Sequence, residues 1–249
     1  MNDFLNAWYG ILTFVLFDIV ALIAVIAITY RWFFKRWLDV FFSVIAIALT
    51  SPLFLAVALR GKKFQKEHEG ALTSLTTKKA YISKKGKTVF THTYQTRDED
   101  GQIFGRYGKW LEETGFYKLP WLLDVFFGRM SFIGVKKFLP SDARFIDEEN
   151  AERFTVRAGL INPLILVGDE ETTYEEMFLS DRRYALYGGL FTDVKVFFKW
   201  LLKKIRGEGK EYLGKTEEQT YSKYLLELEK ITQEDYSAAL ELDQENETR

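Results

Sequence analysis

The stretch KRWLDVFFSVIAIALTSPLFLAVALRGKKFQK, residues 35–66, decides how the fold is organised. Its central run, 40–59, carries no charge and has Ser51-Pro52 at its middle. Proline removes a backbone hydrogen bond and clashes with the preceding turn, at about 3 kcal/mol or more, so a helix is expected to bend or break there. Basic residues flank the run on both sides, and a crossing helix would place one cluster outside, against the positive-inside tendency. The stretch predicts a re-entrant membrane hairpin, broken at this point and open to the cytoplasmic face, whose defining residues are Lys35, Arg36, Asp39, Ser51 and Pro52.

A second apolar segment precedes the hairpin. From Trp8 to Tyr30 the only charge is Asp18, and roughly 20 apolar residues suffice to cross about 30 Å of hydrocarbon. A cleaved signal peptide fits poorly, because no positive charge precedes the segment. Residues 1–34 are expected to hold a transmembrane helix that runs from an outside N-terminus to a cytoplasmic Arg31. The alternative is two spanning helices with a cytoplasmic N-terminus, since kinked spanning helices exist.

The composition excludes several kinds of chemistry. The chain has 249 residues, a net charge of −1, no cysteine and two histidines. The absence of cysteine excludes a disulfide framework, a thiolate metal site and a cysteine nucleophile, and two histidines make a His-rich metal centre or a Ser-His-Asp triad hard to build. The balanced charge argues against a nucleic-acid partner. Any chemistry must therefore use carboxylates or lysines.

The rest of the chain is expected to form a compact, mostly helical α/β domain on the cytoplasmic side, over residues 67–209, followed by a polar helical tail over 210–249. Two β-rich runs around Lys84-Lys85-Gly86-Lys87 predict a small hairpin within 78–96. Helices are expected over Gly105–Thr114, Leu119–Phe127, Asp147–Thr155, Thr173–Leu186 and Thr192–Ile205.

Two of these segments admit two interpretations each. An apolar face on the last helix is interpreted as core packing rather than contact with lipid; its residues are Val194, Phe197, Phe198, Leu201 and Ile205. From Ile231 to the end six acids accompany one arginine, and a frayed helical tail is favoured over a docked one.

Short motifs follow one another in a fixed order along the chain. The first are Lys35-Arg36-Trp37-Leu38-Asp39, Ser51-Pro52, Gly86-Lys87, Leu119-Pro120, Gly128, Met130-Ser131 and Gly134. The later ones are Val156-Arg157-Ala158-Gly159, Tyr174-Glu175-Glu176, Asp181, Asp193 with Lys195, and Arg206-Gly207-Glu208-Gly209. In this order and near-gapless spacing, over roughly 35–209, the chain resembles the bacterial sugar transferase family, the monotopic phosphoglycosyl transferases that start lipid-linked polysaccharide and glycoprotein assembly.

The resemblance implies a location and a reaction. It implies a re-entrant helix and an α/β domain at the bacterial inner (cytoplasmic) membrane, and transfer of a phosphosugar from a nucleotide diphosphate sugar to polyprenyl phosphate. The family's reaction uses a covalent aspartyl intermediate and Mg²⁺, and depends on an Asp-Glu pair before Leu-Pro. This chemistry is physically reasonable, because a carboxylate can attack phosphorus and Mg²⁺ offsets the diphosphate charge.

The chain departs from the family at that pair, which is Tyr117-Lys118 here. A phenol is neutral at pH 7, and a lysine reverses the charge expected beside a metal. Further departures replace Gly-Asp-Met-Ser by residues 128–131, Gly-Pro-Arg-Pro by 134–137, Lys-Phe-Arg by Thr93-Tyr94-Gln95, and Val-Arg-Pro-Gly-Ile-Thr-Gly by 156–162. Two acids have become bases and two bases have become neutral, so no catalytic residue and no metal site are retained. Glu112 and Glu113 are interpreted as exposed helix residues rather than displaced carboxylates.

Three hypotheses follow. The first is a catalytically silent accessory or scaffolding subunit of envelope polysaccharide assembly, bound to membrane lipid or polyprenyl phosphate and paired with an active sugar transferase or another glycan-assembly protein. The second keeps an active transferase, in which basic residues bind the phosphate in place of Mg²⁺ and Tyr117 or another group is the nucleophile; the candidates for phosphate binding are Lys118, Arg129, Lys136 and Arg157. The third is a membrane-surface protein that binds anionic lipid and recruits a partner.

Overall fold

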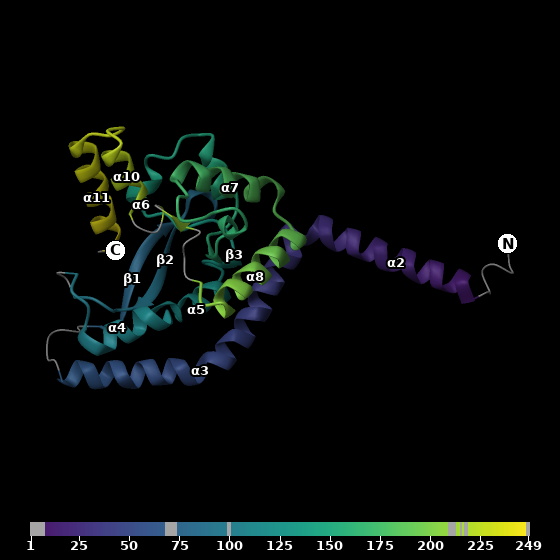
Figure 1. Ribbon diagram of the computed structural model, residues 1–249, viewed down its shortest axis with the longest axis horizontal. Coiled ribbons are helices and arrows are strands. Elements are labelled where there is room, and N and C mark those ends of the chain that lie inside the picture. Colours follow the sequence, from purple (N-terminus) through teal and green to yellow (C-terminus); the bar gives the residue numbers. More distant parts are fainter. Residues whose placement is uncertain are drawn as a thin grey trace.

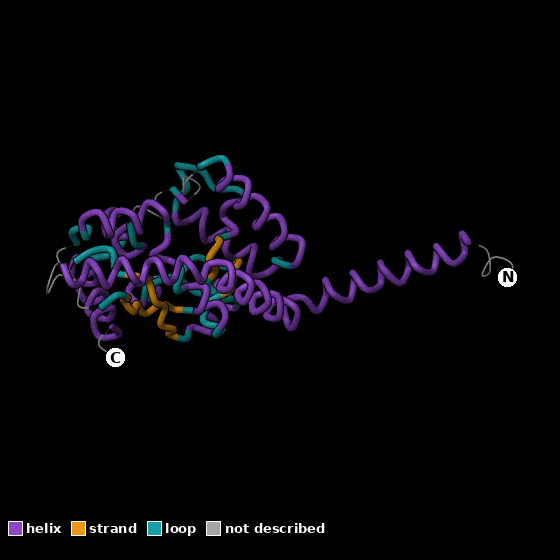
Figure 2. The backbone as a smooth tube through the Cα atoms, turned by 90° about the horizontal axis from the view of Figure 1, so that it is seen from below, coloured by secondary structure: helices purple, strands orange, loops and turns teal. Residues whose placement is uncertain are grey.

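Two long apolar helices lead into a mostly helical domain. The computed structural model describes residues 8–67, 74–98, 101–208, 213–214, 216 and 219–247. A π-helical turn, Tyr30–Phe34, joins α2 (Trp8–Thr29) to α3 (Lys35–Glu67). Figure 1 shows α2 projecting away from the domain while α3 runs along it, and Figure 2 shows the same arrangement from below. By length and composition both helices could cross a membrane, so the two predicted apolar helices are confirmed.

The helix α3 bends in its middle but is not interrupted. It runs continuously through Pro52, and Figure 1 shows two legs that meet at an angle. Pro52 has no amide hydrogen for the carbonyl of Ala48, and the Ser51 hydroxyl donates to that same carbonyl oxygen at 2.9 Å. The freed acceptor is therefore satisfied within the helix, as membrane helices require. The predicted bend is confirmed, and the helical backbone continues through the position at which a break was expected.

Both ends of α3 contact the same domain. At its beginning, Lys35 donates to the Asp193 carboxylate at 2.5 Å. Near its end, Val57 is fully buried in an apolar cluster with Leu111, and the Arg60 guanidinium lies 4.3 Å from the centre of the Trp110 ring. A domain can occupy only one side of a bilayer, so a membrane helix with both ends on it must return to the side from which it entered. This arrangement is that of a re-entrant helix.

The predicted hairpin is present, and two short helices follow it. Strands β1 (Thr76–Ile82) and β2 (Thr88–Tyr94) pair antiparallel, with Ala80 opposite Phe90. The helix α4 (Gly105–Thr114) ends at Gly115, whose φ of 74° is the left-handed conformation that glycine adopts without strain. After a 3₁₀ turn, Phe116–Lys118, comes α5 (Trp121–Phe126), one turn shorter than predicted.

A second, parallel strand pair was not predicted. Strand β3 (Ser131–Ile133) lies beside β4 (Gly159–Ile161), with Ile133 opposite Ile161. The backbones approach so closely just beyond β3 that a Cβ on Gly134 would lie 2.2 Å from the Arg157 carbonyl oxygen. Both strands are only three residues long, which is too short to show alternation in a sequence. Their pairing is nevertheless what carries the 156–159 loop to the end of α5.

Helices α7 (Tyr174–Tyr187) and α8 (Leu190–Ile205) cover the strand pair and are close to their predicted bounds. The Thr173 hydroxyl and the Glu176 carboxylate form a capping box that fixes the start of α7. The prediction that the apolar face of α8 packs into the core was wrong. Of that face, Val194, Phe197, Phe198 and Ile205 are exposed and Leu201 is half-buried, whereas the neighbouring Val196 is fully buried.

The predicted frayed C-terminal tail is also corrected. Helices α10 (Tyr221–Glu227) and α11 (Gln233–Glu247) pack on α6 (Pro140–Ala143), and α11 also contacts β1. The Asp243 carboxylate accepts the backbone N–H of Ser141 at 2.9 Å, and Ala239 is fully buried. The C-terminal segment is therefore a helix docked on the domain, and most of the acidic side chains that the structure describes there lie on the outward face of that helix. The predicted boundary at 209–210 and residues 210–212 lie outside the described residues.

Candidate functional site

A polar cluster fixes the membrane helices to the domain. We call Tyr30, Lys35, Tyr184 and Asp193 the anchor network. Tyr30 and Tyr184 donate to the two Asp193 oxygens at 2.6 and 2.7 Å, and Lys35 bonds both Asp193 and the Tyr184 hydroxyl. Burial beside Asp193 also holds the pKa of Tyr184 well above its usual range, so this phenol stays a neutral donor. The negative charge of Asp193 is thus matched by one lysine and two hydroxyl donors.

A second contact of α3 lies one turn along the helix. Asp39 is buried and accepts hydrogen bonds from the Ser131 hydroxyl at 2.7 Å and from the Phe132 N–H at 3.1 Å. These donors belong to the Met130-Ser131 motif and to β3. The spacing of four residues between Lys35 and Asp39 puts both side chains on the face of α3 that meets the domain. Lys35 and Asp39, two of the hairpin residues singled out from the sequence, therefore join α3 to the domain, whereas Ser51 and Pro52 are exposed at the bend.

The residues at the Asp-Glu position lie in the 3₁₀ turn before α5. Tyr117 is half-buried against the apolar cluster that holds Val57 and Leu111, so its ring contributes to packing. The Lys118 amine lies 5.1 Å from the centres of both the Tyr117 and the Trp121 rings. Both side chains thus form part of an aromatic surface, and a cation lies where the resemblance implies a carboxylate.

A further lysine fills the space beside this pair. The Lys137 amine is buried, without a hydrogen-bond partner, 3.3 Å from the centre of the Trp121 ring and 4.3 Å from that of Tyr81. Burial, and repulsion from Lys118 in second place, lower the pKa of Lys137 well below its usual range. A cation over an aromatic face is attracted to the ring, which favours this position. We call Tyr81, Lys118, Trp121 and Lys137 the lysine–aromatic cluster.

The carboxylate of α5 is already engaged. Asp124 is 1% exposed, and its oxygens accept from Arg129 Nη1 at 2.9 Å and from the His92 backbone N–H at 3.1 Å. Arg129 is thus paired with a buried acid, and its guanidinium also lies 5.4 Å from the centre of the Phe127 ring. The candidate carboxylates Glu112 and Glu113 are engaged too, with Arg97 at 2.8 Å and Lys109 at 3.8 Å.

Two arginines meet at the C-terminal end of α5. Arg157 Nε donates to the Gly128 carbonyl at 3.0 Å, and Arg36 donates to the carbonyls of Val125 and Phe126 at 2.7 and 2.6 Å. A Cβ on Gly128 would lie 3.1 Å from Arg36 Nη2, so the guanidinium packs directly over this glycine. No carboxylate forms an ion pair with Arg36 or Arg157 in the described part of the chain. We call this pair the arginine site.

More positive charge lies near the arginine site. The pKa of Lys84, in the hairpin turn, is lowered by burial and by repulsion from Arg157, Lys85 and Arg31. Arg31 donates to the Ala185 and Leu186 carbonyls at the end of α7. Basic side chains from the hairpin, the π-turn, α3 and the 156–159 loop therefore surround this part of the surface. Their shared feature is an excess of positive charge.

The four predicted phosphate-binding residues do not form one site. Lys118 belongs to the lysine–aromatic cluster, Arg129 pairs with Asp124, and Arg157 lies in the arginine site. Lys136 points elsewhere: its amine donates to the carbonyl of Thr216 and lies 5.2 Å from the centre of the Tyr174 ring. The four candidates therefore lie apart from one another, and the backbone beyond β3 turns the Lys136 side chain toward the C-terminal segment.

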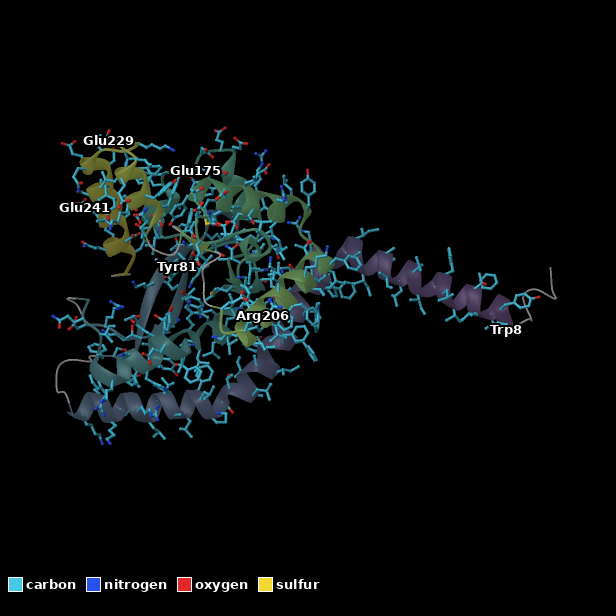
Figure 3. The ribbon with its side chains drawn as sticks, in the orientation of Figure 1. Trp8, Tyr81, Glu175, Arg206, Glu229 and Glu241 are labelled. Carbon is cyan, nitrogen blue, oxygen red and sulfur yellow. The ribbon has the colours of Figure 1, made fainter. Side chains whose placement is uncertain are left out.

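An exposed apolar surface adjoins the arginine site. It consists of side chains on α3, α5 and α8, among them Trp37, Phe41, Leu49, Phe126, Phe127, Phe198 and Ile205. Figure 3 shows Arg206 at the end of α8, whereas Glu175, Glu229 and Glu241 lie on the side of the domain away from α3. Apolar and basic groups therefore occupy one side of the protein, as is typical of a surface that contacts a membrane.

The sequence pattern did not reveal the roles of Trp121, Asp124 and Arg36. The sequence shows Lys137 as a departure from the family pattern, but its position between two rings depends on β1 and α5 coming together. Asp124 lies four residues after Pro120, and nothing in the sequence indicates that it accepts the amide of His92. Arg36 belonged to the hairpin motif, and only the bend of the chain at Gly128 brings it beside Arg157.

The side chains present do not fit the Mg²⁺ that the resemblance implies. Among the described residues no group of three or more His, Cys, Asp and Glu side chains is placed to hold a metal ion. The one carboxylate of α5, Asp124, is already neutralised by Arg129, and Lys118 and Lys137 lie nearby. Mg²⁺ needs oxygen ligands in an octahedral arrangement, and this surface offers mainly donors and positive charge.

A small α/β domain with two long apolar helices, one of which returns to it, defines a membrane-associated type of protein. A family model described as bacterial sugar transferase matches residues 30–207, more than half of the chain. The chain therefore belongs to the bacterial sugar transferase family, and the resemblance read from the sequence is confirmed. A search of the curated proteins found no match. The match does not include α2, α10 or α11.

Proposed function

We propose that this sugar transferase homologue does not itself transfer a phosphosugar and acts as an accessory or scaffolding subunit in bacterial envelope glycoconjugate assembly. The observation that carries the proposal is the lysine–aromatic cluster at the Asp-Glu position. A covalent aspartyl intermediate needs a carboxylate nucleophile, and a phenol held in an apolar cluster is a poor replacement. The anchor network and the re-entrant helix meanwhile keep the parts that a membrane-bound scaffold needs.

The arginine site supports a second element of the proposal, namely binding of a phosphate-bearing lipid. Two guanidinium groups without a paired carboxylate lie beside the exposed apolar surface of α5 and α3. Guanidinium groups bind phosphate through two parallel hydrogen bonds, and the acyl or prenyl chain of a lipid could follow the apolar surface. The ligand is therefore a membrane lipid phosphate, polyprenyl phosphate included, held without a metal ion.

The proposed location is the bacterial inner membrane, with the domain in the cytoplasm and the start of α2 outside. The chain has no cysteine, so single-cysteine variants can be labelled cleanly with a membrane-impermeant thiol reagent. In intact spheroplasts Trp8→Cys should be labelled, whereas Lys63→Cys and Arg206→Cys should react only after lysis. Labelling of Lys63→Cys but not Arg206→Cys in intact cells would mean that α3 crosses the membrane.

The catalytic part of the proposal is tested by nucleotide release. The purified chain is placed in proteoliposomes with polyprenyl phosphate, Mg²⁺ and a panel of nucleotide diphosphate sugars, and release of nucleoside monophosphate is measured. We expect no release above that of empty liposomes. Release by the wild-type chain that disappears in Tyr117→Phe would overturn the proposal and favour the alternative, an active transferase with Tyr117 as nucleophile.

The accessory part needs a separate measurement. A sugar transferase with an intact Asp-Glu pair, purified from the same host, is assayed with and without this chain at equal lipid content. We expect at least a threefold change in its rate or in its retention on the membrane. The Asp193→Ala variant, which lacks the anchor network, is the matched control and should lose the effect. An unchanged rate and unchanged retention would refute the accessory role while leaving the catalytic result intact.

A further inference from the structure

The helix α2 lies outside the part of the chain that the family model matches, and most of its side chains have no described residue packed against them. The family match begins at residue 30, directly after its last residue, Thr29. Its large apolar side chains are exposed except for the half-buried Ile26, and Figure 3 shows Trp8 at the tip farthest from the domain. Lipid can cover the apolar side chains. The hydrocarbon part of lipid offers a carboxylate neither a hydrogen-bond donor nor a positive charge.

Asp18 is that carboxylate, and it lies in the middle of α2. It is exposed and makes no hydrogen bond or ion pair with another described residue. The side chains one turn away are Phe14, Val15, Ala21 and Leu22, which offer no donor. The hydroxyl of Thr13 donates to the Tyr9 carbonyl within its own helix. Nothing on α2 therefore compensates an acid at the depth where ionisable groups face a partner or a polar cavity.

Contacts of the π-turn that follows α2 fix the direction of α2 relative to the domain. Tyr30, in the π-turn directly after it, is 4% exposed and bonded to Asp193, and Arg31 donates to two carbonyls at the end of α7. The direction in which Asp18 faces is thus fixed relative to the domain. A partner that meets Asp18 in the membrane is positioned with respect to the arginine site and to the lysine–aromatic cluster.

The charge decides which partner fits. Two copies of this chain share one orientation in a membrane, so their α2 helices would be parallel and would bring two Asp18 carboxylates to the same depth. Two ionised carboxylates in a medium of low polarity repel strongly, so a second copy could pair with this one only after Asp18 had been neutralised. A basic side chain on the helix of another protein instead gives a charge-compensated pair.

We infer that α2 is a docking helix for a membrane-spanning helix of a different protein that carries a lysine or arginine near mid-membrane, paired with Asp18. The inference concerns a part of the chain outside the family match and stands whether or not the chain transfers phosphosugars. It names the kind of surface through which an accessory subunit would be held to its partner.

The probe is a synthetic single-span helix of leucine and alanine with one central lysine, compared with the same helix carrying leucine there. The full chain, labelled with a donor dye at Trp8→Cys, is placed in vesicles of neutral lipid with acceptor-labelled peptide, and energy transfer is measured against peptide density. We expect at least tenfold tighter association with the lysine helix. Equal association with both helices would overturn the inference.

Variants identify the group responsible. Asp18→Leu should remove the preference, and Asp18→Asn should remove most of it, because an amide keeps hydrogen bonding without the charge. Thr13→Ala is the matched control on the same helix and should keep the full preference. Full preference in Asp18→Asn would refute charge pairing. Energy transfer between two labelled copies, without peptide and dependent on Asp18, would assign the face to a second copy and overturn the inference as well.

Discussion

The base of α3 and the surroundings of α5 use lysine in opposite ways. At the base of α3 the amine of Lys35 lies against Asp193, with tyrosine hydroxyls completing the carboxylate's bonds. Beside α5 the amines of Lys118 and Lys137 face aromatic rings, and the one acid, Asp124, is taken by Arg129. The first region holds Lys35, Asp39 and Asp193, residues on which the resemblance rests, and the second holds its departures, Tyr117 and Lys118. The charges that attach α3 to the domain and the charges around α5 are therefore separate sets of side chains, so one set can change without the other.

The largest expected effect comes from breaking the first region. Asp193→Ala leaves the Lys35 amine and the hydroxyls of Tyr30 and Tyr184 without their acceptor. Removal of one member of a buried, hydrogen-bonded ion pair costs about 3 kcal/mol. We expect the free energy of unfolding in mild detergent to fall by about that amount, measured by denaturant titration of tryptophan fluorescence.

A surface pair provides the control for this variant. Glu208→Ala removes a partner of Lys203 at 2.9 Å, and the Glu208 side chain is 38% exposed where that of Asp193 is 8% exposed. Exposed ion pairs contribute about 0–1 kcal/mol, so this change should be small. Equal losses in Asp193→Ala and Glu208→Ala would mean that the anchor network has no special part in holding α3.

The second region should respond with the opposite sign. Lys137→Met keeps the length of the side chain and removes an amine that is buried without a hydrogen-bond partner. Replacing such a group by an apolar one is expected to raise the free energy of unfolding by about 1 kcal/mol. Lys109→Met, at an exposed position of α4, is the matched control and should leave stability unchanged. A loss of stability in Lys137→Met would show that the contact with Trp121 outweighs the cost of burial.

The same variant makes a prediction about pH. The folded-state pKa of Lys137 is lowered, so between that value and the ordinary lysine pKa of about 10.4 the unfolded chain binds more protons than the folded one. Stability should therefore rise with pH through this window and fall as pH drops through the folded pKa. In unfolding midpoints between pH 7.5 and 9.5, Lys137→Met should show a flatter profile than the wild type. Parallel profiles would contradict the assigned direction.

The sequence predicted the two apolar helices and most helices of the domain, for physical reasons. The helix predicted over Asp147–Thr155 is instead a 3₁₀ helix over Asn150–Thr155. An uncharged run with proline at its centre and bases at both ends constrains α3 strongly, and Gly115 and Thr173 mark helix ends directly. The β3–β4 pair was missed because three-residue strands have no readable period. The apolar face of α8 was assigned to the core, because periodicity identifies an apolar face without saying whether protein or lipid covers it.

The candidate site was only partly predictable. The replacement of the Asp-Glu pair by Tyr117 and Lys118 was visible in the sequence, because it depends on residue identity alone. The separation of Lys136 from Arg157 was not, since it depends on which way each side chain leaves the backbone around Gly134. The meeting of Arg36 with Arg157 was also hidden, because it joins two segments far apart in the chain.

A smaller expected effect distinguishes Arg157 from Lys136 by their contributions to the binding of anionic lipid. Arg157→Gln removes one unpaired guanidinium from the arginine site, and a basic residue near a membrane surface contributes about 1 kcal/mol to the binding of anionic lipid. We expect about fivefold weaker binding of the detergent-free chain, held in nanodiscs, to vesicles that contain anionic lipid, measured by cosedimentation. Lys136→Gln should leave this affinity unchanged, since its amine bonds the Thr216 carbonyl. Equal losses in both variants would mean that net charge alone, and no arginine site, governs binding.

The smallest expected effect on stability concerns the exposed ion pair between Glu112 and Arg97. It shows how little an exposed pair contributes, for comparison with the buried groups of both regions. Hydrogen bonds from Arg97, and in smaller part from Thr96, lower the pKa of Glu112. A carboxylate with a lowered folded-state pKa contributes stability above its ordinary pKa of about 4.3, and that stability is lost as pH falls through the folded value. Between pH 5.5 and 3 the unfolding midpoint of Glu112→Gln should therefore fall slightly less than that of the wild type, while Glu113→Gln should follow the wild type. The slope of the unfolding midpoint against pH could instead differ from the wild type by as much as is expected for Lys137→Met. Solvent exposure would then not distinguish the Glu112 pair from the buried groups, and the contrast between the base of α3 and the surroundings of α5 would need another cause.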